Sequence, residues 1–339
     1  ITFRTAAASL SALALSLLFG PWLIRKLRDF RIGQIIRQEG PESHRAKAGT
    51  PTMGGLLILA ASLGPTLLWA KLDNAYVWIA VLTTALFGGI GFADDYLKVA
   101  RRNTYGLFAR YKMAAQCVVA LGVGIAVVLL ARHEPPLYST RVLFPFFKTL
   151  IPDIGLFYIG FVVLVLVASS NTVNLTDGLD GLAISTFAVA AACFTALAYV
   201  TGHAVFAQYL LLVRIPAAAE LTVFCGALVG ASLGFLWYNA YPAEIFMGDV
   251  GSLAIGAAMV AAQELAGTLT LPRDPMEHAY WGPQFTDADF GKLLDDHDDA
   301  MRVAGCATIR FEDEGELCAV TAQATKTTLA CPSEKNSPA

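Results

Sequence analysis

The stretch YVWIAVLTTALFGGIGFADDYLK (76–98) joins a long apolar run to two acidic residues and a lysine. A helix needs about 20 mostly apolar residues to cross a bilayer, because lipid offers no partner for backbone amides. Residues 76–93 approach that length and carry no charge. The stretch therefore predicts a membrane-spanning helix that ends at Asp94 and Asp95.

The same pattern recurs along the chain. Comparable apolar runs lie near residues 5–24, 53–70, 113–131, 154–170, 179–200 and 219–238. An eighth run, from Ser252 to about Leu271, is weaker because Gln263 and Glu264 interrupt it. We expect an all-α fold, a polytopic transmembrane helical bundle of about seven or eight spans.

Composition supports a lipid environment for most of the chain. Of the 339 residues, 56% are apolar and 15% are charged, whereas soluble proteins average about 45–50% and about 25%. These values argue against a disordered chain, a nucleic-acid binder and most soluble enzymes. Residues 1–271 carry 18 basic and 14 acidic residues, and residues 272–339 carry 6 and 13. We therefore expect an apolar body over 1–271 and an acidic soluble tail over 272–339.

Basic residues predict the orientation of the spans. The two loops richest in Lys and Arg, with seven and five of them, lie at 25–52 and 94–112. The alternate connections hold three at most and lie at 71–75, 132–153 and 201–218. Basic loops face the cytoplasm, so we expect the N-terminus outside. The segments at 170–178 and 239–251 then emerge on the cytoplasmic side as well, and four connections share one face.

Six acids fall at these cytoplasmic span ends: Asp94, Asp95, Asp177, Asp180, Glu244 and Asp249. Ionisable groups this close to hydrocarbon mark a functional site by default. Glycines flank each motif, and we expect them to allow close backbone approach to a ligand. The structural alternative is that the acids are solvated helix ends, with Asp177 or Asp180 capping a helix that begins near Leu179.

The chemistry that suits such a site involves phosphate. Carboxylates without nearby His or Cys disfavour zinc and suit Mg²⁺ or Mn²⁺, and Mg²⁺ is usually held by one or two carboxylates plus substrate phosphates. The same loops supply cations that suit a diphosphate: Lys47, Lys98, Arg101, Arg102, Arg110 and Lys112. The positive-inside rule alone explains most of them, and only Lys47 and Lys112 stand out, because they adjoin motifs. Adjacent helical residues point about 100° apart, so we expect only one of Asp94 and Asp95 to face a metal squarely.

Four motifs, in order and alternating with spans, resemble the phospho-N-acetylmuramoyl-pentapeptide transferase family. They are GPESHRAKAGTPTMGG (40–55), FADDYLK (92–98), NLTDGLDGLA (174–183) and FMGDVGSLA (246–254). The resemblance covers about residues 1–262. It implies transfer of phospho-MurNAc-pentapeptide from UDP-MurNAc-pentapeptide to undecaprenyl phosphate, giving lipid I and UMP. It also implies Mg²⁺ as cofactor, membrane lipid as partner, no nucleic acid, and a multi-pass location in the bacterial inner membrane with the active site on the cytoplasmic face. A homodimer stays open.

The resemblance also implies roles for single residues. Asp249 would ligate Mg²⁺, and Asp94 and Asp95 would serve the metal and the lipid phosphate, with Asp94 deprotonating or positioning the acceptor. The residues expected to line the nucleotide-sugar site are Asn174, Asp177, Asp180 and Asn239. The residues expected near uridine or the diphosphate are Phe246, which would stack on uracil, and Lys47, Thr52 and Lys112.

The chain departs from the family after FMGDVGSLA. The family continues to about ten spans and has a histidine-rich cytoplasmic loop, whereas this sequence turns acidic from Pro272 onward. We therefore expect a transferase domain over 1–271 that is C-terminally incomplete, with the tail fused or disordered. Three alternatives stay open. The chain could be a transporter with an acidic proton relay, although the acids of a transporter would be expected at the midplane of the membrane. It could also be an inactive member of the transferase family, or a sister transferase that uses UDP-GlcNAc.

Overall fold

The computed structural model describes residues 1–29, 50–101, 106–133, 141–142, 154–210, 215–265 and 270–271. All of these lie within one compact unit, Ile1–Tyr280, while the predicted acidic tail at 272–339 lies outside the described residues.

The described part of the chain is helical, as expected. Its main helices are α1 (Thr2–Asp29), α3 (Gly55–Trp69), α4 (Ala75–Arg101), α5 (Ala109–His133), α6 (Phe157–Thr176), α7 (Leu182–Gly202), α9 (Leu221–Asn239) and α10 (Gly248–Leu265). A short helix α8 (Ala204–Tyr209) and a 3-10 helix η1 (Pro216–Glu220) join α7 to α9. Two-residue strands β1 (Arg141–Val142) and β2 (Thr270–Leu271) pair antiparallel.

Within the described residues, six helical segments are long and apolar enough to cross a membrane: α1, α4, α5, α6, α7 and the stretch Pro216–Asn239 that contains α9. Helix α3 has 15 residues and reaches only roughly 22 Å at 1.5 Å per residue. The eighth predicted run differs from expectation, because its helix begins at Gly248 and ends at Leu265, and Leu271 belongs to β2. This helix tolerates Gln263 and Glu264 because protein surrounds it.

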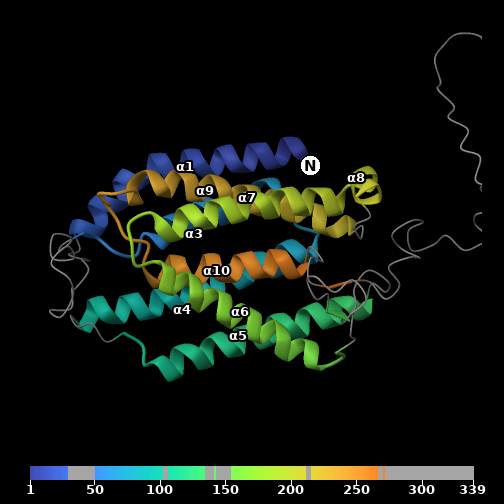
Figure 1. Ribbon diagram of the computed structural model, residues 1–339. Helices are drawn as coiled ribbons and strands as arrows, with labels where there is room; N and C mark the ends of the chain where they lie inside the picture. Colours follow the sequence, from blue (N-terminus) through green and yellow to red (C-terminus); the bar gives the residue numbers. More distant parts are fainter. Residues whose placement is uncertain are drawn as a thin grey trace, which may run out of the picture. The chain divides into compact units, whose positions relative to one another are not determined.

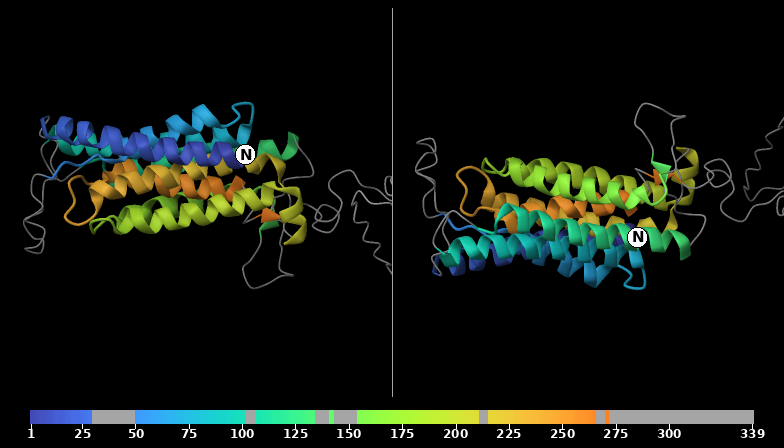
Figure 2. Two further views of the ribbon diagram at one scale, coloured as in Figure 1. Left: turned by 90° about the horizontal axis from the view of Figure 1, so that it is seen from above. Right: turned by 90° about the horizontal axis from the view of Figure 1, so that it is seen from below.

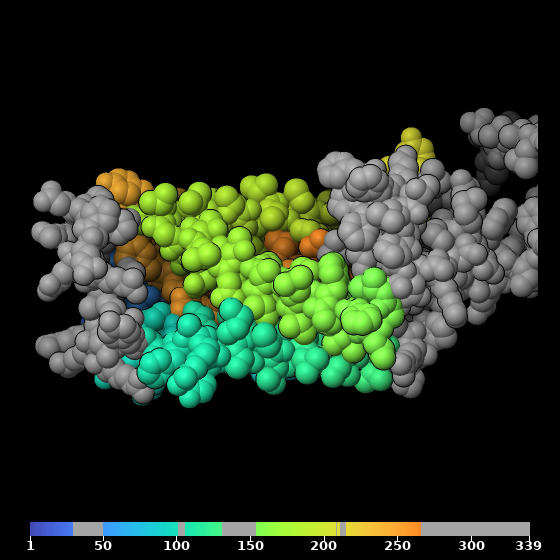
Figure 3. Space-filling view, turned by 60° about the horizontal axis from the view of Figure 1, so that its bottom comes forward, coloured from blue at the N-terminus to red at the C-terminus, as the bar shows by residue number. Residues whose placement is uncertain are grey.

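Helix α10 lies in the middle of the bundle. It contacts α3, α4, α6 and α7, and its orange ribbon lies in the middle of the bundle in both views of Figure 2. Helix α9 packs on α1, α3 and α7, and 83% of its span is buried, compared with 17% for α6. Helices α5, α6 and α7 therefore form an outer face, between whose side chains atoms of α10 are visible (Figure 3).

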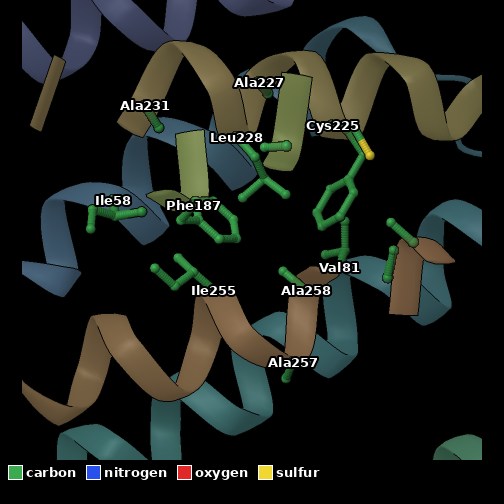
Figure 4. Close-up of a cluster of buried hydrophobic side chains, with 14 of the residues drawn as sticks. Ile58, Val81, Phe187, Cys225, Ala227, Leu228, Ala231, Ile255, Ala257 and Ala258 are labelled. Carbon is green, nitrogen blue, oxygen red and sulfur yellow. The ribbon is translucent and has the colours of Figure 1, made fainter. Parts of the chain in front are cut away.

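The core combines a few large side chains with many small ones. Phe187 of α7 and Leu228 of α9 lie between Ile58, Val81 and Ile255 of three other helices (Figure 4). Small residues bring backbones together where lipid supplies no hydrophobic driving force. The outward faces instead carry large exposed apolar side chains, among them Leu10, Leu18, Phe19, Trp22, Val118, Leu121 and Leu164. A surface of this kind suits lipid contact.

Some glycines in or beside the motifs bring helix backbones close together. A Cβ atom at Gly55 would lie 2.0 Å from the amide nitrogen of Gly251, where α3 meets α10. A Cβ atom at Gly91 would lie 2.1 Å from the carbonyl oxygen of Asp249, where α4 meets α10. These contacts hold the helix ends that carry the acidic motifs against one another.

The acidic motifs meet at one end of the bundle, as predicted. Helices α4 and α6 end there and α5 and α10 begin there, at the end opposite the N-terminus (Figure 1). Direct contacts join all four helix ends, since Asp249 of α10 binds Lys98 of α4, Lys112 of α5 and Asn174 of α6.

Candidate active site

Three carboxylates form the centre of this end of the bundle. Asp94 and Asp95 lie near the end of α4, and Asp249 is the second residue of α10. One oxygen from each lies within 4.8 Å of the others. Asp94 and Asp95 are each only 3% exposed, so the cluster lies inside the protein.

The two adjacent aspartates hold different segments in place. Asp95 Oδ2 accepts a hydrogen bond of 3.1 Å from the backbone amide of Val250, in the first turn of α10, where unpaired amides favour a carboxylate. Asp94 Oδ1 accepts one of 2.6 Å from the amide of Leu107. Both nevertheless contribute an oxygen to the cluster. The side chains diverge in the oxygens that accept these backbone hydrogen bonds, which reach two different segments.

Two lysines neutralise the cluster. Lys98 Nζ lies 2.6 Å from Asp94 Oδ2, 3.4 Å from Asp95 Oδ1 and 2.8 Å from Asp249 Oδ2. Lys112 Nζ lies 2.7 Å from the same oxygen of Asp249 and 3.7 Å from Asp94 Oδ2. The structure thus brings Lys112, expected near the diphosphate, to the acids.

Asn174 and Ser252 orient Asp249 from the other side. The amide nitrogen of Asn174 donates 2.6 Å to Asp249 Oδ1 and 2.7 Å to Ser252 Oγ, and Ser252 Oγ donates 3.0 Å to the carbonyl of Gly248. Asn174 belongs to the last turn of α6 and not to the connection predicted at 170–178. Its position on a helix fixes Asp249 more firmly than a loop would.

Asp177 follows α6 directly and faces the same centre. Burial, together with the negative charges of Asp249 and Asp95, raises the pKa of Asp177 above its ordinary value, while a hydrogen bond from the Gly248 amide opposes the rise. Gly248 has φ 71°, and a Cβ atom there would lie 2.5 Å from Asp95 Oδ2. Only glycine fits this left-handed position beside the carboxylates.

Thr52 and Phe246 lie on a backbone pairing at the edge of the cluster. Phe246 donates its amide to the carbonyl of Pro51 at 2.9 Å, and Gly54 donates to the carbonyl of Phe246 at 2.8 Å. A Cβ atom at Gly248 would lie 3.0 Å from Thr52 Oγ1, so the Thr52 hydroxyl reaches the turn that leads into α10. Lys47, expected beside them, lies outside the described residues.

Asn239 and Asp180 join two loops. Asn239 is 2% exposed; its Oδ1 accepts from the Gly181 amide at 3.1 Å and its Nδ2 donates to the Ile245 carbonyl at 2.9 Å. Asp180 Oδ2 accepts from the Ala243 amide at 3.3 Å. The alternative that an aspartate caps a helix near Leu179 is wrong, because α7 begins at Leu182 after Gly181, with no side-chain cap.

The oxygen donors fit a divalent cation. The three carboxylates are hard ligands of the kind Mg²⁺ and Mn²⁺ take, and the candidate group among the described residues contains neither His nor Cys. Beside them, two ammonium groups supply positive charge for an anionic substrate. The arrangement can therefore hold and neutralise a diphosphate at a buried, charge-dense helix junction.

Sequence comparison agrees with the site's position in the chain. The family described as Glycosyl transferase family 4 matches residues 77–266, which include all three carboxylates of the cluster. A second pattern, phospho-N-acetylmuramoyl-pentapeptide-transferase signature 1, matches residues 47–59. The chain resembles three bacterial proteins named phospho-N-acetylmuramoyl-pentapeptide-transferase.

The similarity to these relatives extends over most of their length. Identity is 56% with the Koribacter versatilis protein and 55% with that of Acidobacterium capsulatum, each over 274 residues, 76% of this chain and 72% of the relative. It is 54% with the Desulfatibacillum aliphaticivorans protein, over 78% of this chain and 74% of the relative.

Proposed function

The chain belongs to the phospho-N-acetylmuramoyl-pentapeptide-transferase family, and from this premise we propose that it transfers phospho-MurNAc-pentapeptide from its UDP carrier to undecaprenyl phosphate. The products are lipid I and UMP, so the protein is an integral membrane enzyme of peptidoglycan biosynthesis. The observation that carries the proposal is the meeting of Asp94, Asp95 and Asp249 with two lysines at one end of the bundle.

The cation in this proposal is Mg²⁺, with Asp249, Asp94 and Asp95 as its ligands. When bound, it would neutralise phosphate charge and polarise the phosphoryl group that is transferred. Asn174 keeps one oxygen of Asp249 engaged, which fixes the direction of the other oxygen. The role of the protein is thus to hold the carboxylates and the substrate phosphates at a fixed distance from one another and to exclude water from them.

The transfer itself is an in-line displacement. An oxygen of the acceptor phosphate forms a bond to the β-phosphorus of the UDP-sugar, and the bond from that phosphorus to the bridging oxygen breaks, so that oxygen and its electron pair leave with UMP. Lys98 and Lys112 lie where they can offset charge that develops on the phosphoryl oxygens. Both lysines are only partly exposed, which strengthens their electrostatic effect.

We assign Asp94 a positioning role, and not that of a general base. One oxygen of Asp94 accepts from the Leu107 amide and the other pairs with Lys98, so both oxygens are engaged. An acceptor monophosphate is largely dianionic near neutral pH and needs no base. The competing scheme has an aspartyl-phosphate intermediate. It predicts exchange of labelled UMP into the UDP-sugar without acceptor lipid, whereas direct attack predicts no exchange.

The nucleotide-sugar pocket is assigned to the rim of the cluster. Asp177, the Thr52 hydroxyl and the Phe246 ring lie on segments that meet at Gly248, and Lys112 faces the diphosphate. Lys47 belongs to the same proposal through the family. Asp180 and Asn239 support the pocket through the loops they join.

We place the site on the cytoplasmic face of the inner membrane, because the basic loops at 25–52 and 94–112 adjoin it. The transferase domain in this proposal is residues 1–271, separate from the acidic tail, and a homodimer stays an open expectation. Cysteine labelling from either side of sealed vesicles tests the orientation. A cysteine at Leu175, beside the site, is expected to react from the cytoplasmic side, and one at Leu72, at the opposite end, from the outer side.

Release of UMP by the purified full chain tests the function. The assay supplies UDP-MurNAc-pentapeptide and undecaprenyl phosphate in detergent, with or without Mg²⁺. The proposal expects UMP only when both substrates and the cation are present. Replacing the donor by UDP-GlcNAc tests the sister activity, and faster turnover with that donor would contradict the assignment. A folded sample that releases no UMP beside an active relative would refute catalysis by this chain.

A further inference from the structure

Lys98 occupies an unusual position for a lysine next to a cation site. Its ammonium group lies within 3.4 Å of all three carboxylates of the cluster. Two of those contacts, at 2.6 and 2.8 Å, are charge-assisted hydrogen bonds of normal length. The ammonium thus contacts the same three carboxylates that a divalent cation would take as ligands.

An ammonium and a divalent cation compete for these carboxylates. One oxygen from each carboxylate lies within 4.8 Å of the others, and Mg²⁺ binds oxygen at about 2.0–2.1 Å. An ammonium that kept its bonds to the same oxygens would lie against the metal, where repulsion between like charges in a buried site is strong. One cation therefore has to leave when the other arrives.

We propose that the Lys98 ammonium is a built-in competitor of the metal: it pairs with the three carboxylates until a divalent cation displaces it. The proposal rests on the divalent-cation site of the function proposed above, and it adds a second position for Lys98. Binding of the cation exchanges one positive partner of the carboxylates for another. The three carboxylates therefore have a second cation beside them, in addition to Lys112, both before and after the metal binds.

The side chain of Lys98 is suited to this exchange. It is 34% exposed, compared with 4% for Asp94 and Asp95, so its end has room to move toward solvent. A lysine ammonium sits on a flexible four-carbon stem. Once displaced, it lies at the mouth of the cluster, where an incoming phosphate would meet it. Lys98 is then a phosphate ligand in the loaded enzyme.

Lys112 does not play the same part. It pairs closely with one carboxylate, Asp249, and its distance to Asp94 is 3.7 Å. A cation at the cluster removes one close contact of Lys112 but three contacts of Lys98. The competition should therefore be strong at Lys98 and weak at Lys112.

Direct metal binding tests the exchange without any turnover. The full chain is purified in detergent, treated with EDTA and titrated with Mn²⁺, and free Mn²⁺ is followed by electron paramagnetic resonance. Lys98→Gln is expected to lower the Kd for Mn²⁺ by about tenfold or more, since it removes the competing charge. Lys112→Gln should lower it less. Lys71→Gln, the same change at an exposed position in the α3–α4 connection, should leave it unchanged.

Activity of the same variants gives an opposite result. UMP release by Lys98→Gln should fall although its metal site fills at lower Mn²⁺, because the displaced lysine no longer meets the phosphate. An unchanged or higher Kd for Mn²⁺ in Lys98→Gln would overturn the exchange. Absence of Mn²⁺ binding in every chain, the wild type included, would refute the metal site itself.

Folding of the variant is a second readout. Three carboxylates without Lys98 repel one another, so Lys98→Gln and Lys98→Met should unfold at lower temperature in EDTA and recover when Mn²⁺ is added. The recovery should exceed the effect of Mn²⁺ on the wild type. A variant that stays unfolded at saturating Mn²⁺ would contradict the claim that the two cations are equivalent at these oxygens.

Discussion

The backbone of Gly91 in α4 lies against the backbone of Asp249 in α10: a Cβ atom at Gly91 would be 2.1 Å from the Asp249 carbonyl oxygen and 2.6 Å from the Val250 amide nitrogen. Real Cβ atoms do not approach that closely, so any larger residue separates the two helices. Asp94 and Asp95 lie one turn further along α4. The distance between the two halves of the carboxylate cluster thus depends on this glycine.

Gly91→Ala should therefore lower both stability and activity. Forced separation of packed helices costs about 1–3 kcal/mol, and it moves Asp94 and Asp95 away from Asp249. Thermal unfolding in detergent and Mn²⁺ affinity measure the two effects. Gly89→Ala is the matched control, because nothing lies within 4 Å of a Cβ atom there. It should be neutral or slightly stabilising, since alanine favours helix. Equal behaviour of the two variants would contradict this role of Gly91.

Asn174→Ala should slow turnover by about 10- to 100-fold, with little loss of folded protein. The variant removes the hydrogen bond to Asp249 Oδ1 and leaves that carboxylate oriented only through its other oxygen, by Lys98 and Lys112. Such losses of orientation are costly in catalysis. Asn171→Ala is the control on the same helix, because Asn171 donates to Gln116 and not to the cluster. Its activity per folded molecule should stay within about twofold of wild type, and UMP release compares the two.

Arg4→Gln should reduce stability without changing the rate of the folded enzyme. Arg4 makes two hydrogen bonds to the Glu220 carboxylate, at 2.8 and 2.6 Å, near the start of α9. Removing the cation leaves that carboxylate, 6% exposed, without its charged partner, at a cost of roughly 2–3 kcal/mol. The pair joins α1 to the end of the bundle opposite the cluster. A change in the kcat of fully folded Arg4→Gln would contradict this prediction, because it would show that the end of the bundle opposite the cluster affects the site.

Asp177 gives a pH dependence of stability. Its pKa is raised in the folded protein, so folding favours the protonated form. The stability from this group is present at low pH and is lost as pH rises from about 4 through the raised pKa. Asp177→Asn imitates the neutral form at every pH. In EDTA its unfolding temperature should match wild type near pH 4 and exceed it increasingly toward pH 8. A constant difference, or one that shrinks with pH, would contradict this.

Much of the architecture follows from the sequence by simple physics. The lengths of apolar runs and the bias of Lys and Arg predicted that the motifs around Asp94, Asp177 and Asp249 share one face, and contacts such as Asp249–Asn174 confirm it. Helix ends were less predictable. The end of an apolar run indicates where the chain leaves the lipid, and it does not indicate where the helix ends. Helices α4 and α6 continue beyond their apolar runs, to Arg101 and Thr176.

That difference explains why Lys98 was not singled out. It was counted among the basic loop residues, yet on a continuous helix it lies four residues after Asp94 and three after Asp95, on the same face. This spacing is the signal that could have identified it. Ser252 carries no such signal, since only the packing of α6 on α10 brings Asn174 to it. The glycines were noted, but which neighbour they approach depends on tertiary structure.

The central claim is that Asp249 and its two aspartate neighbours form a cation-dependent site that transfers a phospho-sugar to a lipid phosphate. The most direct measurement is the amount of lipid-linked product extracted after reaction of wild type and Asp249→Asn, each with Mg²⁺ or EDTA. We expect product only from wild type with Mg²⁺, and at least about a hundredfold less from the variant, although both unfold at similar temperatures with Mg²⁺ present. Equal product from folded Asp249→Asn, or undiminished product in EDTA, would contradict the account.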